Sequence, residues 1–269
     1  MLNVRLLKST SLMAAFAAVA PAAAQELAPH RAVYVVSSLE HGKPGIETSG
    51  TYAYELRLTC DGYVINQRLR LEATGPRTTT SEQQSHMTES RDGRKLQFEH
   101  RTTSGGRQTS LVKGEASLGD GETGEARFSD PEGQTVALPP KTRFPVAIAR
   151  ETVRRAKAGE NGFDALFFFG ERVKPPQEVN VVIGRVPKRL ADVKIPEGGE
   201  ALADGRTRIY YRAGFFDPQS RGAGEPVFEM SSVTLDNGIE LYGTHEESDG
   251  GIEYRITRLE PLPQPECKK

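Results

Sequence analysis

The chain has 269 residues, with 35 Lys or Arg against 36 Asp or Glu and a formal net charge of −1. A nucleic-acid-binding protein usually gathers a basic excess on one face, so this balance argues against nucleic acid as a partner. Beyond the first two dozen residues no apolar run approaches the roughly 20 residues that span a bilayer, which predicts no transmembrane segment in the mature chain.

The first 24 residues have the order of a secretory signal peptide. Arg5 and Lys8 provide the charged start, and residues 12–20 form a short apolar run, followed by an A-x-A cleavage site that ends at Ala24. The run is too short to cross a membrane. We expect cleavage after Ala24, which leaves a mature chain of residues 25–269 in the periplasm of a host with two membranes.

The mature chain opens with a predicted β-hairpin. Residues 52–60 alternate between apolar and polar side chains, as a half-buried strand does. Asp61-Gly62 then marks a tight turn, and a second alternating run covers residues 63–71. Cys60 therefore lies at a strand end, beside the turn.

The next segments continue the pattern less evenly. Residues 74–90 are polar and rich in Thr, Ser and Gln, and we expect them to form an exposed edge or loop. Glycine turns precede two further strands, predicted over residues 95–102 and 108–118.

Residues 119–124 match the bare glycine pattern of a dinucleotide site. That site requires a helix directly after the glycines, and Ala126–Phe128 have the pattern of another strand. We interpret the segment as a glycine-rich hairpin turn and expect no nucleotide or other cofactor.

One helix is predicted from Pro145 to a stop at Gly159. Proline suits the first helical turn, and Arg154, Arg155 and Lys157 complement the negative end of the helix dipole. The apolar stripe is narrow, which favours a helix laid against a sheet.

Residues 166–169, Leu-Phe-Phe-Phe, place apolar bulk on both faces of any strand that they occupy. Two interpretations remain open: a strand buried on both sides, or a strand with one face lining an apolar groove for an acyl chain or an apolar peptide. A second aromatic pair, next to Tyr210-Tyr211, presents the same choice. The candidate groove residues are Phe167, Phe168, Phe169, Phe215 and Phe216.

The last part of the chain begins with an irregular segment, residues 187–205, that we interpret as a crossover or a domain boundary. Three strands follow, over residues 227–235, 239–245 and 251–259, the first two joined by an Asp-Asn-Gly turn. Strands of this length and spacing indicate a mainly β protein with an antiparallel sheet. We favour a single domain of residues 25–269.

Cys60 and Cys267 are the two cysteines of the chain. Export delivers them to an oxidising compartment, where thiols tend to pair, and we interpret them as a disulfide. Two free thiols or an intermolecular bridge are the alternatives. A bond between them would tie the first hairpin to the tail, which supports the single-domain interpretation.

The sequence offers no catalytic signature that we recognise. None of the five histidines has a second ligand at the spacing of a metal site, and His245-Glu246-Glu247 lacks the later histidine of a zinc-protease helix. No serine lies in a G-x-S-x-G elbow. We therefore predict a protein that is not an enzyme and has no catalytic or metal-binding residues.

Four segments together resemble the EipB-type cell envelope integrity family, which began as a domain of unknown function. They are Ala28–Tyr34, Cys60–Tyr63, Asn237-Gly238 and Leu259–Pro263, the last leading to Cys267. The resemblance extends over essentially the whole mature chain. It implies a periplasmic β-spiral, a long antiparallel sheet curled into a spiral or half-barrel around one α-helix, similar to lipoprotein-carrier and lipoprotein-sensor folds.

The family resemblance also implies a role in envelope integrity, no catalytic residues, and a disulfide where the two cysteines stand. It raises a periplasmic tetratricopeptide-repeat protein as one partner. The chain departs from the family pattern at residues 168–170 and 248–251, where we would expect an Asp-Gly pair and an acidic, aromatic, glycine motif. The resemblance therefore does not predict the surface contacts near these two segments.

Three functions follow from these observations. The first is a non-enzymatic periplasmic integrity protein that binds another envelope component. The second is a carrier of lipid or lipoprotein acyl chains, in which a curved sheet shields methylenes from water at about 0.8 kcal/mol each. The third is an enzyme of unrecognised type, which would require convergent carboxylates or histidines.

Overall fold

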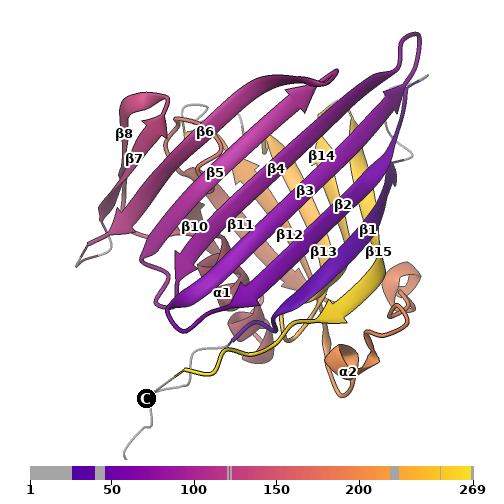
Figure 1. Cartoon of the computed structure of the whole chain (residues 1–269). Helices are drawn as coiled ribbons and strands as arrows, with labels where there is room; N and C mark the ends of the chain where they lie inside the picture. Colours follow the sequence, from indigo (N-terminus) through magenta and orange to yellow (C-terminus); the bar gives the residue numbers. More distant parts are fainter. Residues whose placement is uncertain are drawn as a thin grey trace, which may run out of the picture.

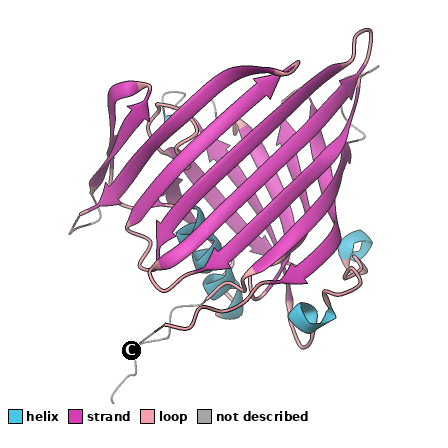
Figure 2. Cartoon of the chain, in the orientation of Figure 1, coloured by secondary structure: helices cyan, strands magenta, loops and turns pink. Residues whose placement is uncertain are grey.

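The computed structural model describes residues 26–39, 46–119, 121, 123–218, 224–248 and 250–267. The predicted signal peptide lies outside this range. Within it, fifteen strands form one curled sheet, with α1 inside the curl and two short helices at its rim (Figures 1 and 2). The strands are β1 (His30–Ser38), β2 (Glu47–Leu58), β3 (Gly62–Thr74), β4 (Thr79–Ser90), β5 (Lys95–Ser104), β6 (Arg107–Leu118), β7 (Gly124–Asp130), β8 (Glu132–Leu138), β9 (Thr142–Arg143), β10 (Gly162–Phe167), β11 (Gln177–Gly184), β12 (Arg208–Phe216), β13 (Phe228–Leu235), β14 (Glu240–Glu247) and β15 (Gly250–Pro261).

The strand order is β8-β7-β6-β5-β4-β3-β2-β1-β15-β14-β13-β12-β11-β10-β9. Neighbours pair antiparallel, except for the short parallel pair of β9 with β10. The first and last strands pair in the middle of the sheet, from His30 opposite Pro261 to Ser38 opposite Ile252. The sheet folds back so that β2–β5 and β10–β13 form two facing walls (Figure 1). The predicted fold class, an antiparallel sheet curled around one helix, is confirmed.

Helix α1 (Pro145–Lys157) follows its sequence signals. Pro145 begins it, three basic residues occupy its last turn, and Gly159 follows with a φ of +73°, a conformation that glycine adopts without strain. The helix contacts β10 and β11 on one side, and the backbone amides at its N-terminus donate hydrogen bonds to Glu89 of β4 on the other. It therefore fills one end of the space between the walls.

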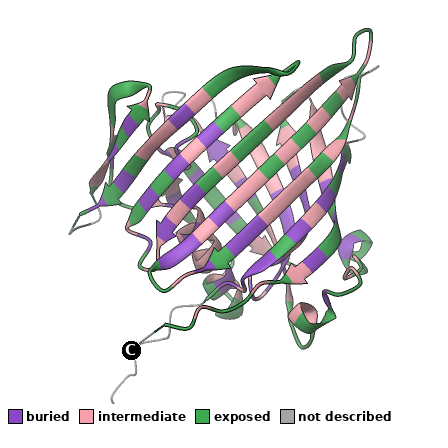
Figure 3. Cartoon of the chain, in the orientation of Figure 1, coloured by how far each residue is buried: buried purple, intermediate pink, exposed green. Residues whose placement is uncertain are grey.

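The main core lies between α1 and the walls. Strand residues alternate between buried and exposed positions, so one face of each strand points inward (Figure 3). This core includes the buried side chains of Leu56, Tyr63, Ile65, Met87, Leu96, Phe98, Phe144, Val146, Val153 and Phe168. Burial of side chains of this size provides about 1.5–3 kcal/mol each.

One predicted segment is wrong. Residues 74–90 were expected as an exposed edge or loop, but β4 occupies Thr79–Ser90 and pairs along its length with β3 and β5. Most of its Ser, Thr and Gln side chains lie on the more exposed half of the strand, where an apolar face is not required. Two hydrogen-bonded neighbours determine the strand, and a single sequence does not show them.

The predicted crossover at residues 187–205 joins two adjacent strands. It contains η1 (Lys188–Leu190) and α2 (Glu200–Ala203), and the strands before and after it, β11 and β12, pair directly. Asn237 donates a side-chain hydrogen bond to the Leu202 carbonyl at 2.8 Å. This contact fastens α2 to the turn between β13 and β14.

Candidate functional site on the inner face of the sheet

The five predicted aromatic residues do not share one surface. β10 ends at Phe167, and Phe168 and Phe169 lie in the loop after it. Phe168 is buried against Phe98 and Phe144, so it belongs to the core. Phe215 and Phe216 are neighbours in β12 and point to opposite faces.

Phe167, Phe169 and Phe215 instead join a row of rings on the inner face. Ring centroids lie 5.9 Å apart for Phe167 and Phe169, and 5.7 Å apart for Phe167 and Phe215. Phe228 stacks on Phe215 at 4.2 Å and on His245 at 4.7 Å, and His100 lies 4.7 Å from Phe169. We call these six residues the aromatic row: His100, Phe169, Phe167, Phe215, Phe228 and His245.

The aromatic row crosses strands that lie far apart in the sequence. Its members come from β5, β10 and the loop that follows it, β12, β13 and β14. Phe167, Phe169, Phe228 and His245 keep part of their surface accessible, whereas Phe215 and His100 are buried. Sequence reasoning missed His100, Phe228 and His245, because only strand pairing places them beside the phenylalanines.

His100 fixes one end of the row. Its Nε2 lies 2.9 Å from the Phe169 carbonyl oxygen and its Nδ1 lies 2.8 Å from Ser85 Oγ. A carbonyl can only accept, so Nε2 carries the proton and Nδ1 accepts from the serine hydroxyl. Burial lowers the pKa of His100 to about 4, which keeps the ring neutral. The histidine holds the loop against β5.

A group of tyrosines lies farther inside, which we call the tyrosine cluster: Tyr34, Tyr52, Tyr54, Tyr211 and Tyr254. Tyr34 and Tyr52 are directly opposite on paired strands, with centroids 5.3 Å apart, and Tyr254 meets both edge-on at 5.7 Å. Tyr211 comes from the opposite wall and interacts electrostatically with Tyr54. Burial is the main cause of the raised pKa of each hydroxyl, so all five remain protonated donors.

Glu240 is the carboxylate of this region. Pairing of β13 with β14 skips Leu241, because Val233 is opposite Tyr242 and Thr234 is opposite Glu240. The bulge turns Glu240 to the inner face, where regular alternation would not place it. The Tyr254 hydroxyl donates to Glu240 Oε1 at 3.3 Å, and the Tyr34 hydroxyl donates to the Glu240 carbonyl at 2.9 Å.

Burial raises the pKa of Glu240 to about 7, against the favourable contribution of its hydroxyl neighbours. Four of these inward groups nevertheless keep accessible surface: Glu240, Tyr52, Tyr54 and Tyr211. The inner face thus presents two groups of side chains: Glu240 with the phenol rings of the tyrosines, and the aromatic row. An amphiphilic molecule has the same division into a polar and an apolar part.

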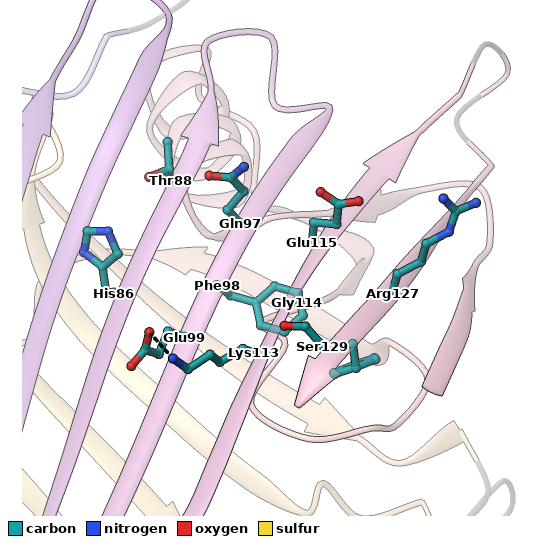
Figure 4. Close-up of a pocket in the computed structure, with 11 residues that line it drawn as sticks. His86, Thr88, Gln97, Phe98, Glu99, Lys113, Gly114, Glu115, Arg127 and Ser129 are labelled. Atoms are coloured by element: carbon teal, nitrogen blue, oxygen red, sulfur yellow. Dashed lines mark ion pairs between the residues drawn. The ribbon is translucent and has the colours of Figure 1, made fainter. Parts of the chain in front are cut away.

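A hollow of about 420 Å³ lies on β4–β7, away from the aromatic row (Figure 4). Glu99 faces Lys113 across it at 3.1 Å, and Arg101 lies 3.3 Å from the same carboxylate. Ligand pockets are usually apolar with a few polar groups that bind the ligand. In this hollow the charged side chains pair with one another instead. We therefore place the candidate site on the inner face.

The residues that the structure describes contain no group of three or more His, Cys, Asp or Glu arranged to hold a metal ion. His245 lies in β14, and its Nε2 is 3.3 Å from Oε1 of Glu247, two residues farther along the same strand. His41 is outside the described residues. β6 and β7, on either side of the glycine pattern, pair antiparallel with Leu118 opposite Gly124, as expected for a hairpin; residues 120 and 122 lie outside the described residues.

The structure joins Cys60 to Cys267, with Cα atoms 5.5 Å apart and 207 residues between them. Cys60 follows β2 at the turn into β3, and Cys267 lies in the tail beyond β15. Both cysteines are exposed. The disulfide predicted from the sequence is thus present, and it lies at the surface.

Comparison with known proteins found a family model, a curated relative and a solved structure that match this chain. A family model described as EipB-like matches residues 21–247. The chain is 27% identical over 256 residues to the cell envelope integrity protein EipB of Brucella abortus (strain 2308), covering 93% of this chain and 90% of that protein. Its fold matches the crystal structure of a β-barrel-like protein of a domain of unknown function from Brucella abortus, with a TM-score of 0.78, 22% identity, and coverage of 89% of this chain and 100% of the other. No helix among the described residues is long and apolar enough to cross a bilayer.

Proposed function

Because this chain belongs to the EipB-like family, we propose that it is a periplasmic protein that maintains cell envelope integrity by binding another envelope component, without catalysis. The name of the Brucella relative supports the integrity role. An exposed disulfide supports an oxidising compartment. The cleaved signal peptide ending at Ala24 is part of the same proposal.

The aromatic row is the observation that carries a binding role. Six rings in contact, four of them partly accessible, line the inner face of the sheet. Aromatic side chains bring large apolar area with little conformational freedom to lose, which favours them in binding sites. The row supports an apolar part of the bound component.

The second candidate function is a carrier of lipid or lipoprotein acyl chains. Its support is the position of the row on the concave side of the curled sheet (Figure 1). Each methylene transferred from water contributes about 0.8 kcal/mol. A periplasmic tetratricopeptide-repeat protein, expected from the family resemblance, is the alternative partner and would require an outer surface.

Complementation of a deletion strain tests the binding surface. Phe228→Ala removes an inward, partly exposed ring, and Phe216→Ala removes a partly exposed ring on the other face of β12. We expect Phe216→Ala to restore growth on a bile-salt detergent and Phe228→Ala to fail, with both proteins at equal abundance. Equal restoration by the two variants would remove the inner face from the proposal.

Native mass spectrometry of the protein purified from the envelope identifies the component itself. It reports bound lipid, bound protein and the state of the cysteines in one measurement. A mass increment of lipid size favours the carrier, and an increment of protein size favours the protein partner. An unliganded chain in all preparations would contradict a stable complex.

A further inference from the structure

The inner face holds a carboxyl group, Glu240, that the proposed function does not use. Glu240 projects among tyrosines from both walls, and the residue as a whole is only partly buried. The Tyr254 hydroxyl, which donates to Glu240 Oε1, favours its ionised form. In the part of the chain that the structure describes, no Lys or Arg forms an ion pair with Glu240.

A carboxylate in such surroundings favours a cationic ligand. Removal of a charge from water is costly unless an opposite charge accompanies it. A bound cation would provide that partner for Glu240 and offset the burial that now raises its pKa. The charge of the site thus selects for a positive group.

The tyrosine rings add a second preference for the same charge. A cation over the face of an aromatic ring is attracted by the ring quadrupole, and ammonium groups are recognised in this way. Tyr52, Tyr54 and Tyr211 keep accessible surface on the inner face, and each interacts electrostatically with Glu240. Carboxylate and rings therefore meet at one place.

The position of the tyrosines relative to the aromatic row gives the shape of the ligand. Tyr211, Ala213 and Phe215 share the inner face of β12 and one apolar cluster with Met230 and Phe228. Tyr211 and Phe215 are four residues apart, which is about 13 Å along a strand. One ligand can thus place an ammonium group at Glu240 and extend an apolar chain along the aromatic row.

We propose that the inner face binds a membrane lipid with an ammonium head group, the ammonium at Glu240 among the tyrosines and the acyl chain along the aromatic row. This inference rests on the proposed function and specifies its ligand. The lipid class is that of amine-bearing lipids, as opposed to anionic or uncharged ones.

Isothermal titration calorimetry with the mature chain, residues 25–269, tests the head-group preference. The probes are dodecylammonium and dodecyl phosphate below their micellar concentrations, with butylammonium as a head without a tail. We expect dodecylammonium to bind at least tenfold more tightly than dodecyl phosphate, and butylammonium to bind at least tenfold more weakly than dodecylammonium. Glu240→Gln should lower the dodecylammonium affinity about tenfold and leave dodecyl phosphate unchanged.

Glu246→Gln is the matched control, because Glu246 belongs to the same strand and, as the neighbour of His245, points to the outer face. It should change the dodecylammonium affinity less than twofold, which separates a specific site from general attraction to an acidic protein. Circular dichroism verifies folding of each variant. Tyr52→Leu is the second test, with an expected threefold or greater loss for dodecylammonium alone.

The outcomes separate the two proposals. Equal affinities for both head groups, or a preference that Glu240→Gln retains, would overturn the head-group inference and leave the acyl-chain carrier intact. No binding of either dodecyl probe would overturn the inference and the carrier together. The integrity role would then depend on the protein partner, which mass spectrometry detects independently.

Discussion

Glu89 is a buried carboxylate that holds the start of α1. The side chain of Phe144, at the N-cap position, makes no capping hydrogen bond. Instead the backbone amides of Val146 and Ala147 donate to the two carboxylate oxygens of Glu89, each at 2.7 Å. The positive end of a helix is a favourable place for an acceptor from another element. One residue of β4 thus connects the sheet to the helix.

The pH dependence of folding should report this residue. Burial raises the pKa of Glu89 to about 8, from 4.5 for a free side chain. The folded state then holds a proton that the unfolded state has lost, so stability falls as pH rises from 4.5 to 8. Buried His30 and His100, each with a pKa near 4, act in the opposite direction and only below pH 6.5.

We therefore expect Glu89→Gln to flatten the stability curve between pH 6.5 and 8.5 by about 2 kcal/mol relative to the parent. Urea unfolding followed by circular dichroism measures both curves. Glu240, with a pKa near 7, contributes equally to the two proteins and cancels in the comparison. Glu229→Gln, at an outward site, should run parallel to the parent. Parallel curves for Glu89→Gln as well would show that this carboxyl does not titrate in that window.

At the same scale, the sequence predicted the cysteine pair but not Glu89 or Glu240. Two cysteines in an exported chain have few alternatives. A glutamate inside an alternating strand has the pattern of a solvent-exposed residue, and only register and a bulge turn it inward. Sequence patterns therefore did not predict Glu240 as part of the candidate site.

Gly243 in β14 makes room for a ring of the tyrosine cluster. It is directly opposite Tyr254 of β15, and a Cβ placed on it would overlap the Cζ and Oη atoms of that ring. The glycine lets Tyr254 lie flat over the backbone of its neighbour strand, within reach of Glu240. The Gly243–Tyr254 pair therefore shapes the inner surface of β14 and β15.

Gly243→Ala should lower the free energy of unfolding by about 1–3 kcal/mol, because the ring must move to admit the methyl group. Gly184→Ala at the end of β11 is the control, since its nearest atom would be 3.8 Å away. Thermal unfolding of both variants measures the difference. Near-ultraviolet circular dichroism should change for Gly243→Ala only. Identical melting curves would mean that the ring adapts without cost.

Elements were predictable where alternation was clear. The hairpins at Asp61-Gly62 and Asn237-Gly238 and the helix at Pro145 all form as expected. The aromatic run at residues 166–169 was taken as one strand, yet β10 ends at Phe167 and the chain leaves the sheet there. Its last two rings contact β5 through His100 and Phe98, which are more than 60 residues away in the sequence. Such long-range contacts decide the end of the strand.

The disulfide acts on the molecule as a whole. It closes a loop of over 200 residues, for which chain entropy gives an upper value of about 5 kcal/mol. We expect Cys60→Ser and Cys267→Ser to lower the melting temperature equally, and the double variant to match the singles. Reductant should bring the parent to the same value, since both cysteines are exposed. Unequal single variants would indicate a separate role for one thiol.

The overall fold was predicted through the family resemblance more than through composition or spacing. Alternation indicates that strands are antiparallel, but it does not say that β1 pairs with β15. That pairing decides which rings meet inside the curl, and Tyr34 contacts Tyr254 only because of it. The single domain of residues 25–269 stays a prediction. The candidate site is a property of the closed sheet, which explains why only part of it was foreseen.

The strand order has a consequence for how the chain could be rewired. β8 and β9 are the two ends of the sheet and are separated by only three residues, whereas β1 and β15 are neighbours in its centre. A circular permutant opened between β8 and β9, with a linker from the tail to the start of β1, would read β9 to β15 and then β1 to β8. Every strand pair would then be sequential, and every pair except the parallel β9 and β10, which α1 connects, would be antiparallel. Contact order would fall, and the permutant should refold faster than the natural arrangement.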